Sequence, residues 1–168
     1  IRGLVFCSRK EECHSLSSAF NQRGYNTIAL TGDSTEEFRK EAIIKLESDS
    51  QNKLDYIFTV DIFNEGIDIP KVNQILMLRP TNSAIIFVQQ LGRGLRKVEG
   101  KQYVTIIDFI GNYQNNYLVP IALYGDTSYN KDTLRKMIAG GSKMLPGAST
   151  INFDKVTKES IYASIDST

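Results

Sequence analysis

The segment Gly3-Leu4-Val5-Phe6-Cys7-Ser8 decides the fold class, because its continuous apolar run predicts a short strand that is buried on both faces. Ser8 and Glu11 then form a capping-box pattern, which predicts that a helix begins directly after the strand. Apolar residues recur at helical spacing as far as Gly24, which is well placed to end that helix. A buried strand followed by an amphipathic helix is typical of proteins in which helices connect the strands of a parallel sheet.

The same alternation continues outward from this segment. A second capping-box pattern at Ser34 and Glu37 predicts a helix, and the apolar residues Phe38, Ala42 and Leu46 share one face of it. Further strands are predicted over residues 27–30, 56–60, 74–78 and 103–109, and a helix over residues 83–90. We therefore expect an α/β fold with a three-layer parallel sheet that carries helices on both faces. In such sheets, ligands collect at the carboxyl ends of the strands.

The length of 168 residues and the change to a polar and aromatic sequence after Gly111 predict one domain with an appendage. Residues 1–119 form the predicted domain, and residues 120–168 form a helical and irregular extension that leads to a further domain. Turn signals at residues 140–142 follow a predicted helix over residues 133–138. Because the sequence has no initiator Met, we expect it to be a fragment of a longer protein.

Charge and composition exclude several classes of function. The net charge of +1 argues against a stand-alone nucleic-acid-binding protein with a broad basic face, although a domain that supplies half of a binding groove stays open. The cysteines Cys7 and Cys13 fit no zinc spacing and no disulfide framework, so we expect no metal site and a reducing, cytoplasmic location. His14, the only histidine, is interpreted as a helix-surface residue. No apolar run approaches the ~20 residues of a membrane span, so we expect no membrane partner.

The strongest candidate for chemistry is the segment Gln89-Gln90-Leu91-Gly92-Arg93-Gly94-Leu95-Arg96. Arg93 and Arg96 are three residues apart, so on a helix they share one side, where two guanidinium groups repel each other unless an anion lies between them. The neighbouring glycines allow close approach of the backbone, and a polyphosphate suits planar groups with several donors. The alternative interpretation is a solvated basic helix end.

A second candidate is the segment from Thr59 to Pro70, which leaves a predicted buried strand and is interrupted by Gly66. Asp68 lies between two isoleucines near the end of the sheet, where a carboxylate can accept hydrogen bonds from a ribose hydroxyl. A turn or helix-cap aspartate is the alternative interpretation of the same residue.

Together these segments resemble the C-terminal RecA-like domain of superfamily 2 helicases, over about residues 1–112. The matching segments have the order and spacing of that family, and they are residues 3–9, 31–34, 59–70 and 89–96. Gln90 departs from the family pattern Gln-Arg-x-Gly-Arg-x-x-Arg, which has an arginine at this position. The sequence contains no Gly-x-x-x-x-Gly-Lys-[Ser/Thr] phosphate loop and no acidic Mg²⁺-binding segment, so the resemblance implies a first motor lobe upstream of Ile1.

The resemblance implies an ATP-dependent nucleic-acid helicase or translocase. ATP with Mg²⁺ would lie in the cleft between two lobes and would be held mainly by the N-terminal RecA-like lobe. Arg93 and Arg96 would be catalytic, acting on the γ-phosphate. The further residues implied to bind the nucleotide are Gly66, Asp68, Gln89 and Gly92. The residues implied to contact the phosphates of the strand are Ser8, Arg9, Thr31, Gly32, Asp33 and Thr59.

Residues 107–113 and 128–132 add a narrower resemblance, to bacterial superfamily 2 helicases related to type III restriction subunits. We expect the nucleic acid to be DNA, with RNA as the alternative. We expect the isolated chain to have no ATPase activity, because it lacks the residues that hold the triphosphate and Mg²⁺. The alternative function is a RecA-like binding or scaffold module without motor activity, and an upstream phosphate loop would favour the motor.

Overall fold

The computed structural model describes residues 1–60, 62, 69–79, 99–109, 121, 123–125, 128, 130–144 and 150–167. The chain divides into two compact units, residues 1–79 with 89–109 and residues 80–88 with 110–168. The division into a domain over 1–119 and an extension over 120–168 stays a prediction, because residues 110–120 lie outside the described part. The helix predicted over residues 83–90 lies outside it as well.

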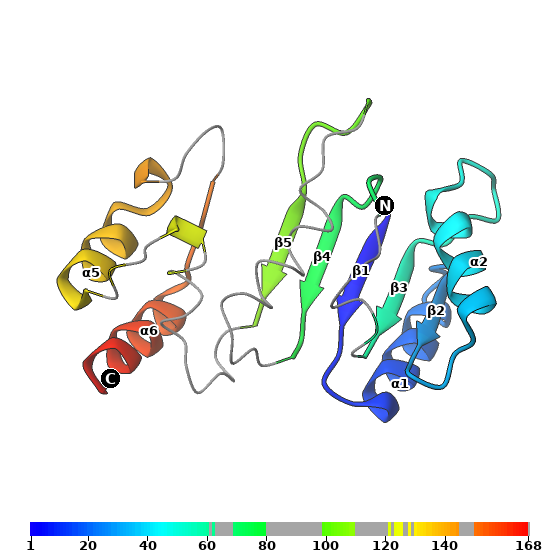
Figure 1. Ribbon diagram of the computed structural model, residues 1–168, viewed down its shortest axis with the longest axis horizontal. Helices are drawn as coiled ribbons and strands as arrows, with labels where there is room; N and C mark the ends of the chain where they lie inside the picture. Colours follow the sequence, from blue (N-terminus) through cyan, green and yellow to red (C-terminus); the bar gives the residue numbers. More distant parts are fainter. Residues whose placement is uncertain are drawn as a thin grey trace. The chain divides into compact units, whose positions relative to one another are not determined.

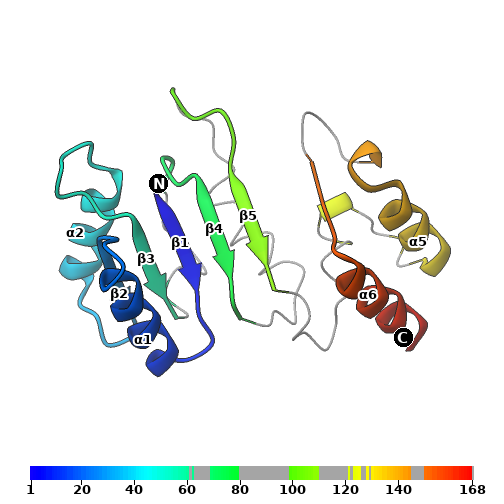
Figure 2. The same cartoon turned by 180° about the vertical axis from the view of Figure 1, so that it is seen from behind.

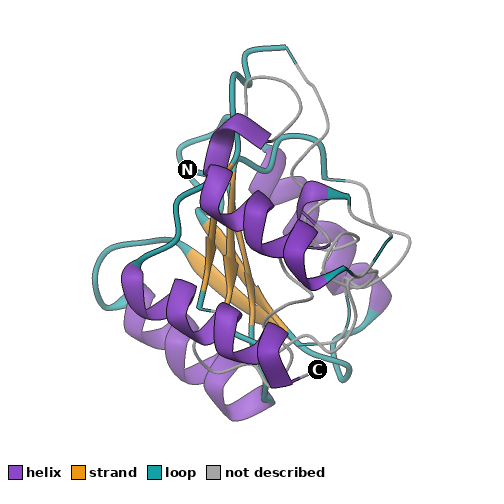
Figure 3. Ribbon diagram, turned by 90° about the vertical axis from the view of Figure 1, so that its left-hand side faces the viewer, coloured by secondary structure: helices purple, strands orange, loops and turns teal. Residues whose placement is uncertain are grey.

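A parallel sheet is the centre of the described part of the first unit (Figure 1, Figure 2). The strands lie in the order β2-β3-β1-β4-β5, and every neighbouring pair is parallel. Figure 3 draws them in orange, side by side. Their bounds are β1 Gly3–Phe6, β2 Thr27–Leu30, β3 Tyr56–Thr59, β4 Gln74–Met77 and β5 Thr105–Asp108. The predicted α/β fold with a parallel sheet is confirmed.

The central position of β1 follows from its apolar sequence. Leu4 pairs in register with Ile57 of β3 on one side and Ile75 of β4 on the other, and all three side chains are completely buried. Gly3 is the first residue of β1. A Cβ atom at this position would lie 2.2 Å from Cδ1 of the Tyr56 ring. Such a distance is too short for any side chain, so the close approach of Tyr56 requires glycine at this position.

Two helices connect the first three strands in sequence. Helix α1, Lys10–Asn21, packs Phe20 against Phe58 of β3 with the ring centroids 5.1 Å apart in an edge-to-face arrangement. Helix α2, Glu36–Glu47, buries Ala42 and Leu46 as the sequence predicts. Phe38, in the first turn of α2, remains 42% exposed, so only Ala42 and Leu46 of the three apolar residues on this face are buried.

Both helices begin one residue later than the capping-box patterns predict. In α2 the cap is Thr35, whose hydroxyl accepts a hydrogen bond from the Phe38 N–H at 3.2 Å, while the Ser34 hydroxyl bonds within the preceding loop. In α1 the cap position is Arg9, and the Glu12 carboxylate accepts from the Ser8 N–H at 2.7 Å. The capping hydroxyl of α2 is therefore that of Thr35 and not that of Ser34, and the cap residue of α1, Arg9, makes no side-chain capping hydrogen bond.

The described part of the second unit includes the helices α5 (Lys131–Gly140) and α6 (Lys155–Ser167), with a short 3₁₀ helix η2 (Gly141–Met144) after α5. The helix predicted over residues 133–138 is confirmed and is longer. Buried leucine and isoleucine side chains line one face of each helix, and Arg135 of α5 pairs with Asp166 of α6. Among the described residues, no helix is long and apolar enough to cross a membrane.

Candidate nucleic-acid interface

The candidate phosphate-binding segments leave the sheet at one edge. The parallel register places Phe6, Leu30 and Thr59 in one row at the carboxyl ends of β1, β2 and β3. The hydrogen bond from the Cys7 N–H to the Thr59 carbonyl, at 2.9 Å, continues this register by one residue. The segments that begin at Ser8 and at Thr31 therefore start at the same edge, as the sequence predicts.

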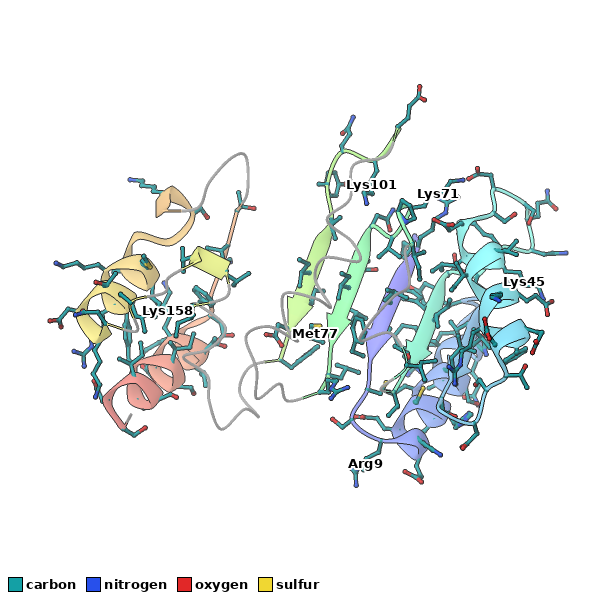
Figure 4. The ribbon with its side chains drawn as sticks, viewed as in Figure 1. Arg9, Lys45, Lys71, Met77, Lys101 and Lys158 are labelled. Carbon is teal, nitrogen blue, oxygen red and sulfur yellow. The ribbon has the colours of Figure 1, made fainter. Side chains whose placement is uncertain are left out.

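The first of these segments, Ser8 and Arg9, presents exposed polar groups. Both residues are exposed, and the Ser8 hydroxyl lies 3.4 Å from the Leu78 carbonyl oxygen beyond β4. In the described part of the chain, no carboxylate pairs with the Arg9 guanidinium, which Figure 4 shows at this edge, opposite the end that carries Lys71 and Lys101. A guanidinium that is exposed and not bound to a protein carboxylate can bind a phosphate from solution.

The second segment, Thr31 to Asp33, is a loop stabilised by its own hydrogen bonds. The Thr31 N–H donates to the Ser34 hydroxyl at 3.0 Å, and the Asp33 N–H donates to the Thr31 hydroxyl at 3.4 Å. Thr31 is only 4% exposed, and its hydrogen bonds stabilise the loop from its buried side. Gly32 is exposed, with no atom within 4 Å of where its Cβ would lie. The backbone at Gly32 is therefore open to close approach by a ligand.

Two basic residues that the sequence analysis missed, Arg39 and Lys10, contact the loop from Thr31 to Asp33. Arg39 of α2 donates from Nη2 to the Thr31 carbonyl at 3.3 Å and to the Gly32 carbonyl at 3.0 Å, which fixes the loop to the helix. The Lys10 ammonium lies 2.5 Å from an Asp33 carboxylate oxygen, and this hydrogen bond, followed by the Lys10 charge, lowers the pKa of Asp33. The helical position of Arg39, one turn after the Thr35 cap, is the signal that could have indicated its contact with the loop.

Thr59 lies at the carboxyl end of β3, below the surface of this edge. Its side chain is completely buried, and among the described residues its hydroxyl oxygen has no hydrogen-bond partner. The side chain is buried because Thr59 is still part of β3, where its carbonyl accepts from the Cys7 N–H inside the sheet. The phosphate contact expected of Thr59 stays a prediction.

The residues expected to bind the nucleotide lie outside the described part. They are Gly66, Asp68, Gln89, Gly92, Arg93 and Arg96. The described residues that flank Gly66 and Asp68 most closely are Ile62, which is half-buried, and Ile69, which is buried. In the described part of the chain, no group of three or more His, Cys, Asp or Glu residues could hold a metal ion, and Cys7 and Cys13 are buried free thiols. His14 is exposed on α1, as predicted.

Comparison with known proteins agrees with this geometry. The profile of the helicase conserved C-terminal domain matches residues 2–98. The Saccharomyces cerevisiae protein named "Putative ATP-dependent helicase IRC3" is 36% identical over 108 residues, which are 64% of this chain and 15% of that protein. The Neosartorya fischeri pre-mRNA-splicing ATP-dependent RNA helicase prp28 is 29% identical over 65% of this chain and 13% of its own length. The chain thus spans about a seventh of these relatives.

A solved structure supports the fold. The E. coli DEAD-box protein SrmB, in a crystal structure with regulator of ribonuclease activity A, has a TM-score of 0.55 and 24% identity to this chain. The match covers 73% of this chain and 65% of that one. The parallel sheet, the segments at its carboxyl edge and the profile match over residues 2–98 lead to one conclusion: the chain belongs to the helicase conserved C-terminal domain family, the C-terminal RecA-like domain of superfamily 2 helicases.

Proposed function

We propose that this chain is the C-terminal motor lobe of a longer ATP-dependent helicase or translocase, and that its carboxyl edge holds the phosphates of a nucleic-acid strand. The observation that carries the proposal is the exposure of Ser8, Arg9 and Gly32 at one edge of the sheet. The Arg9 guanidinium, which pairs with no carboxylate among the described residues, the Ser8 hydroxyl and the open backbone at Gly32 are donors that suit phosphate oxygens. Contacts of this kind position a strand and carry no sequence information.

Arg93 and Arg96 are the proposed contribution of this lobe to ATP hydrolysis, and Asp68 with Gly66, Gln89 and Gly92 the proposed contribution to nucleotide binding. This part of the proposal is supported by membership of the family and by the spacing of the two arginines. ATP, with Mg²⁺, would be held mainly by the N-terminal lobe. Closing and opening of the two lobes during each ATP cycle would then move the strand.

The proposed strand is DNA, on the resemblance of residues 107–113 and 128–132 to helicases related to type III restriction subunits. Several relatives are named as RNA helicases, so the test below includes both nucleic acids. A scaffold module without motor activity is the competing function, and it predicts no change in strand binding through the ATP cycle.

Replacing Arg9 by alanine in the full-length protein tests the strand surface. We expect the affinity for single-stranded oligonucleotides to fall by about three- to tenfold, equally for all base sequences, because the lost contact is to phosphate. The slope of log affinity against log salt should become flatter by about 0.7. Fluorescence anisotropy with labelled DNA and RNA at several salt concentrations measures both effects.

Arg23→Ala is the matched control, because Arg23 is also an exposed arginine of the α1 region but bonds to the Ala19 carbonyl at the opposite end of the helix. It should leave binding unchanged. Equal affinities of the Arg9→Ala variant and the wild-type protein would contradict the proposed strand surface.

A further inference from the structure

Two donors of the proposed strand surface are already occupied by carboxylates of the chain itself. The Ser8 N–H donates to Glu12 Oε2 at 2.7 Å, and Lys10 Nζ donates to Asp33 Oδ2 at 2.5 Å. Ser8 and Lys10 flank Arg9, and Asp33 follows the open backbone of Gly32. Both acidic side chains therefore lie at the position where phosphates of a strand would arrive.

The contact between the Ser8 N–H and the Glu12 carboxylate occupies a backbone donor at the carboxyl edge of the sheet. Ser8 precedes the cap position, Arg9, and lies in an exposed segment at the carboxyl edge of the sheet. The Ser8 N–H therefore donates its hydrogen bond to an anionic group of the protein itself, the Glu12 carboxylate. A phosphate oxygen forms the same charge-assisted hydrogen bond with a backbone N–H.

The Lys10–Asp33 pair connects two segments that are 23 residues apart in the sequence. The Lys10 side chain is 50% exposed and the Asp33 side chain 76% exposed, so the pair lies in water and can separate at low cost. Asp33 is an anion and cannot neutralise a phosphate, whereas Lys10 can. The contribution of this pair to strand binding therefore comes from the lysine, and the aspartate competes with the strand for it.

We propose that Glu12 and Asp33 are placeholder carboxylates, which occupy the phosphate-binding donors of the free lobe and are displaced by the phosphates of the bound strand. This inference rests on the proposed function and concerns the regulation of the same surface. Each carboxylate weakens strand binding, because its hydrogen bond must be broken and its charge repels the phosphate. A strand held against such competitors is released more readily, which a motor requires in every cycle.

The test is the affinity of the full-length protein for a single-stranded oligonucleotide after removal of one negative charge. Asp33→Asn and Glu12→Gln should each tighten binding by about two- to fivefold, which is the range expected for one exposed charge interaction. Glu37→Gln and Glu11→Gln are the matched controls, because these glutamates are exposed in the first turns of α2 and α1 and neither forms an ion pair with a cation among the described residues. These controls should shift the affinity by less than about 1.5-fold, since exposed charges are screened by salt.

Variants of Lys10 distinguish competition between Asp33 and the strand for this lysine from a general repulsion between Asp33 and the phosphates. Lys10→Ala should weaken binding and flatten the salt slope by about 0.7. It should also remove most of the gain from Asp33→Asn in the double variant, because the gain comes from freeing Lys10. Thermal unfolding of each variant shows whether the fold is intact.

Several results would overturn the inference. One such result is that Asp33→Asn and Glu12→Gln raise the affinity for the oligonucleotide no more than the control variants do. Another is that Asp33→Asn raises the affinity by the same factor in the Lys10→Ala background as in the wild-type protein. If the wild-type protein binds no oligonucleotide at all, the proposed function fails and this inference fails with it, which is a distinguishable outcome.

Discussion

Arg93→Ala and Arg96→Ala in the full-length protein are each expected to lower nucleic-acid-stimulated ATP hydrolysis by about 10³- to 10⁵-fold. An arginine aimed at the γ-phosphate stabilises the charge that develops in the transition state, so its loss lowers the rate of the chemical step. In free energy the expected loss is roughly 4–7 kcal/mol. Since the N-terminal lobe would hold most of the nucleotide, the affinity for ATP should change by less than about threefold. A steady-state phosphate-release assay and binding of a fluorescent ATP analogue measure the two quantities.

Arg93→Lys and Arg96→Lys sharpen this test, because lysine keeps the charge but loses the planar, two-pronged donor. We expect both lysine variants to remain severely impaired. Arg23→Ala, a change of the same type at an exposed site of the first unit, should hydrolyse ATP at the wild-type rate. Normal turnover in Arg93→Ala and Arg96→Ala would refute the arginine-finger assignment.

Phe58→Ala is expected to lower the free energy of unfolding of the chain by about 3–5 kcal/mol. Phe58 is 1% exposed on β3, and its ring meets Phe20 of α1 edge-to-face, so removal leaves a cavity between the sheet and the helix. Urea unfolding followed by circular dichroism measures the change, with the slope against urea expected to stay constant.

Phe38→Ala is the control for this substitution. The same atoms are removed from the first turn of α2, where the side chain is 42% exposed. We expect a loss below about 1 kcal/mol, because most substitutions at exposed sites have small effects. Similar losses for Phe58→Ala and Phe38→Ala would contradict the assignment of the core to the region between β3 and α1.

The fold could be predicted because each strand is a continuous apolar run. Strand β2 has the predicted bounds, whereas the prediction of residues 103–109 for β5 is too long by two residues at its start and one at its end. Tyr103 belongs to that excess, and it is 74% exposed. An aromatic residue with high strand propensity does not extend a strand unless a neighbouring strand offers hydrogen bonds.

The candidate site could be predicted only in part. Placing Ser8 and Gly32 at one edge follows from the parallel topology alone, and the structure agrees. Two findings depend on spatial neighbours: the burial of Thr59 and the pairing of Lys10 with Asp33. Propensity and spacing describe a residue and its near neighbours in the sequence, so they carry no information about a partner 23 residues away.

The central claim, that this chain is one lobe of a two-lobe ATP-driven motor, is tested most directly by ATP turnover with and without single-stranded nucleic acid. The full-length protein should hydrolyse ATP faster when the strand is present, whereas the isolated 168-residue chain should show no turnover in either condition. Turnover by the isolated chain, or a full-length protein whose hydrolysis is absent or indifferent to the strand, would contradict the account.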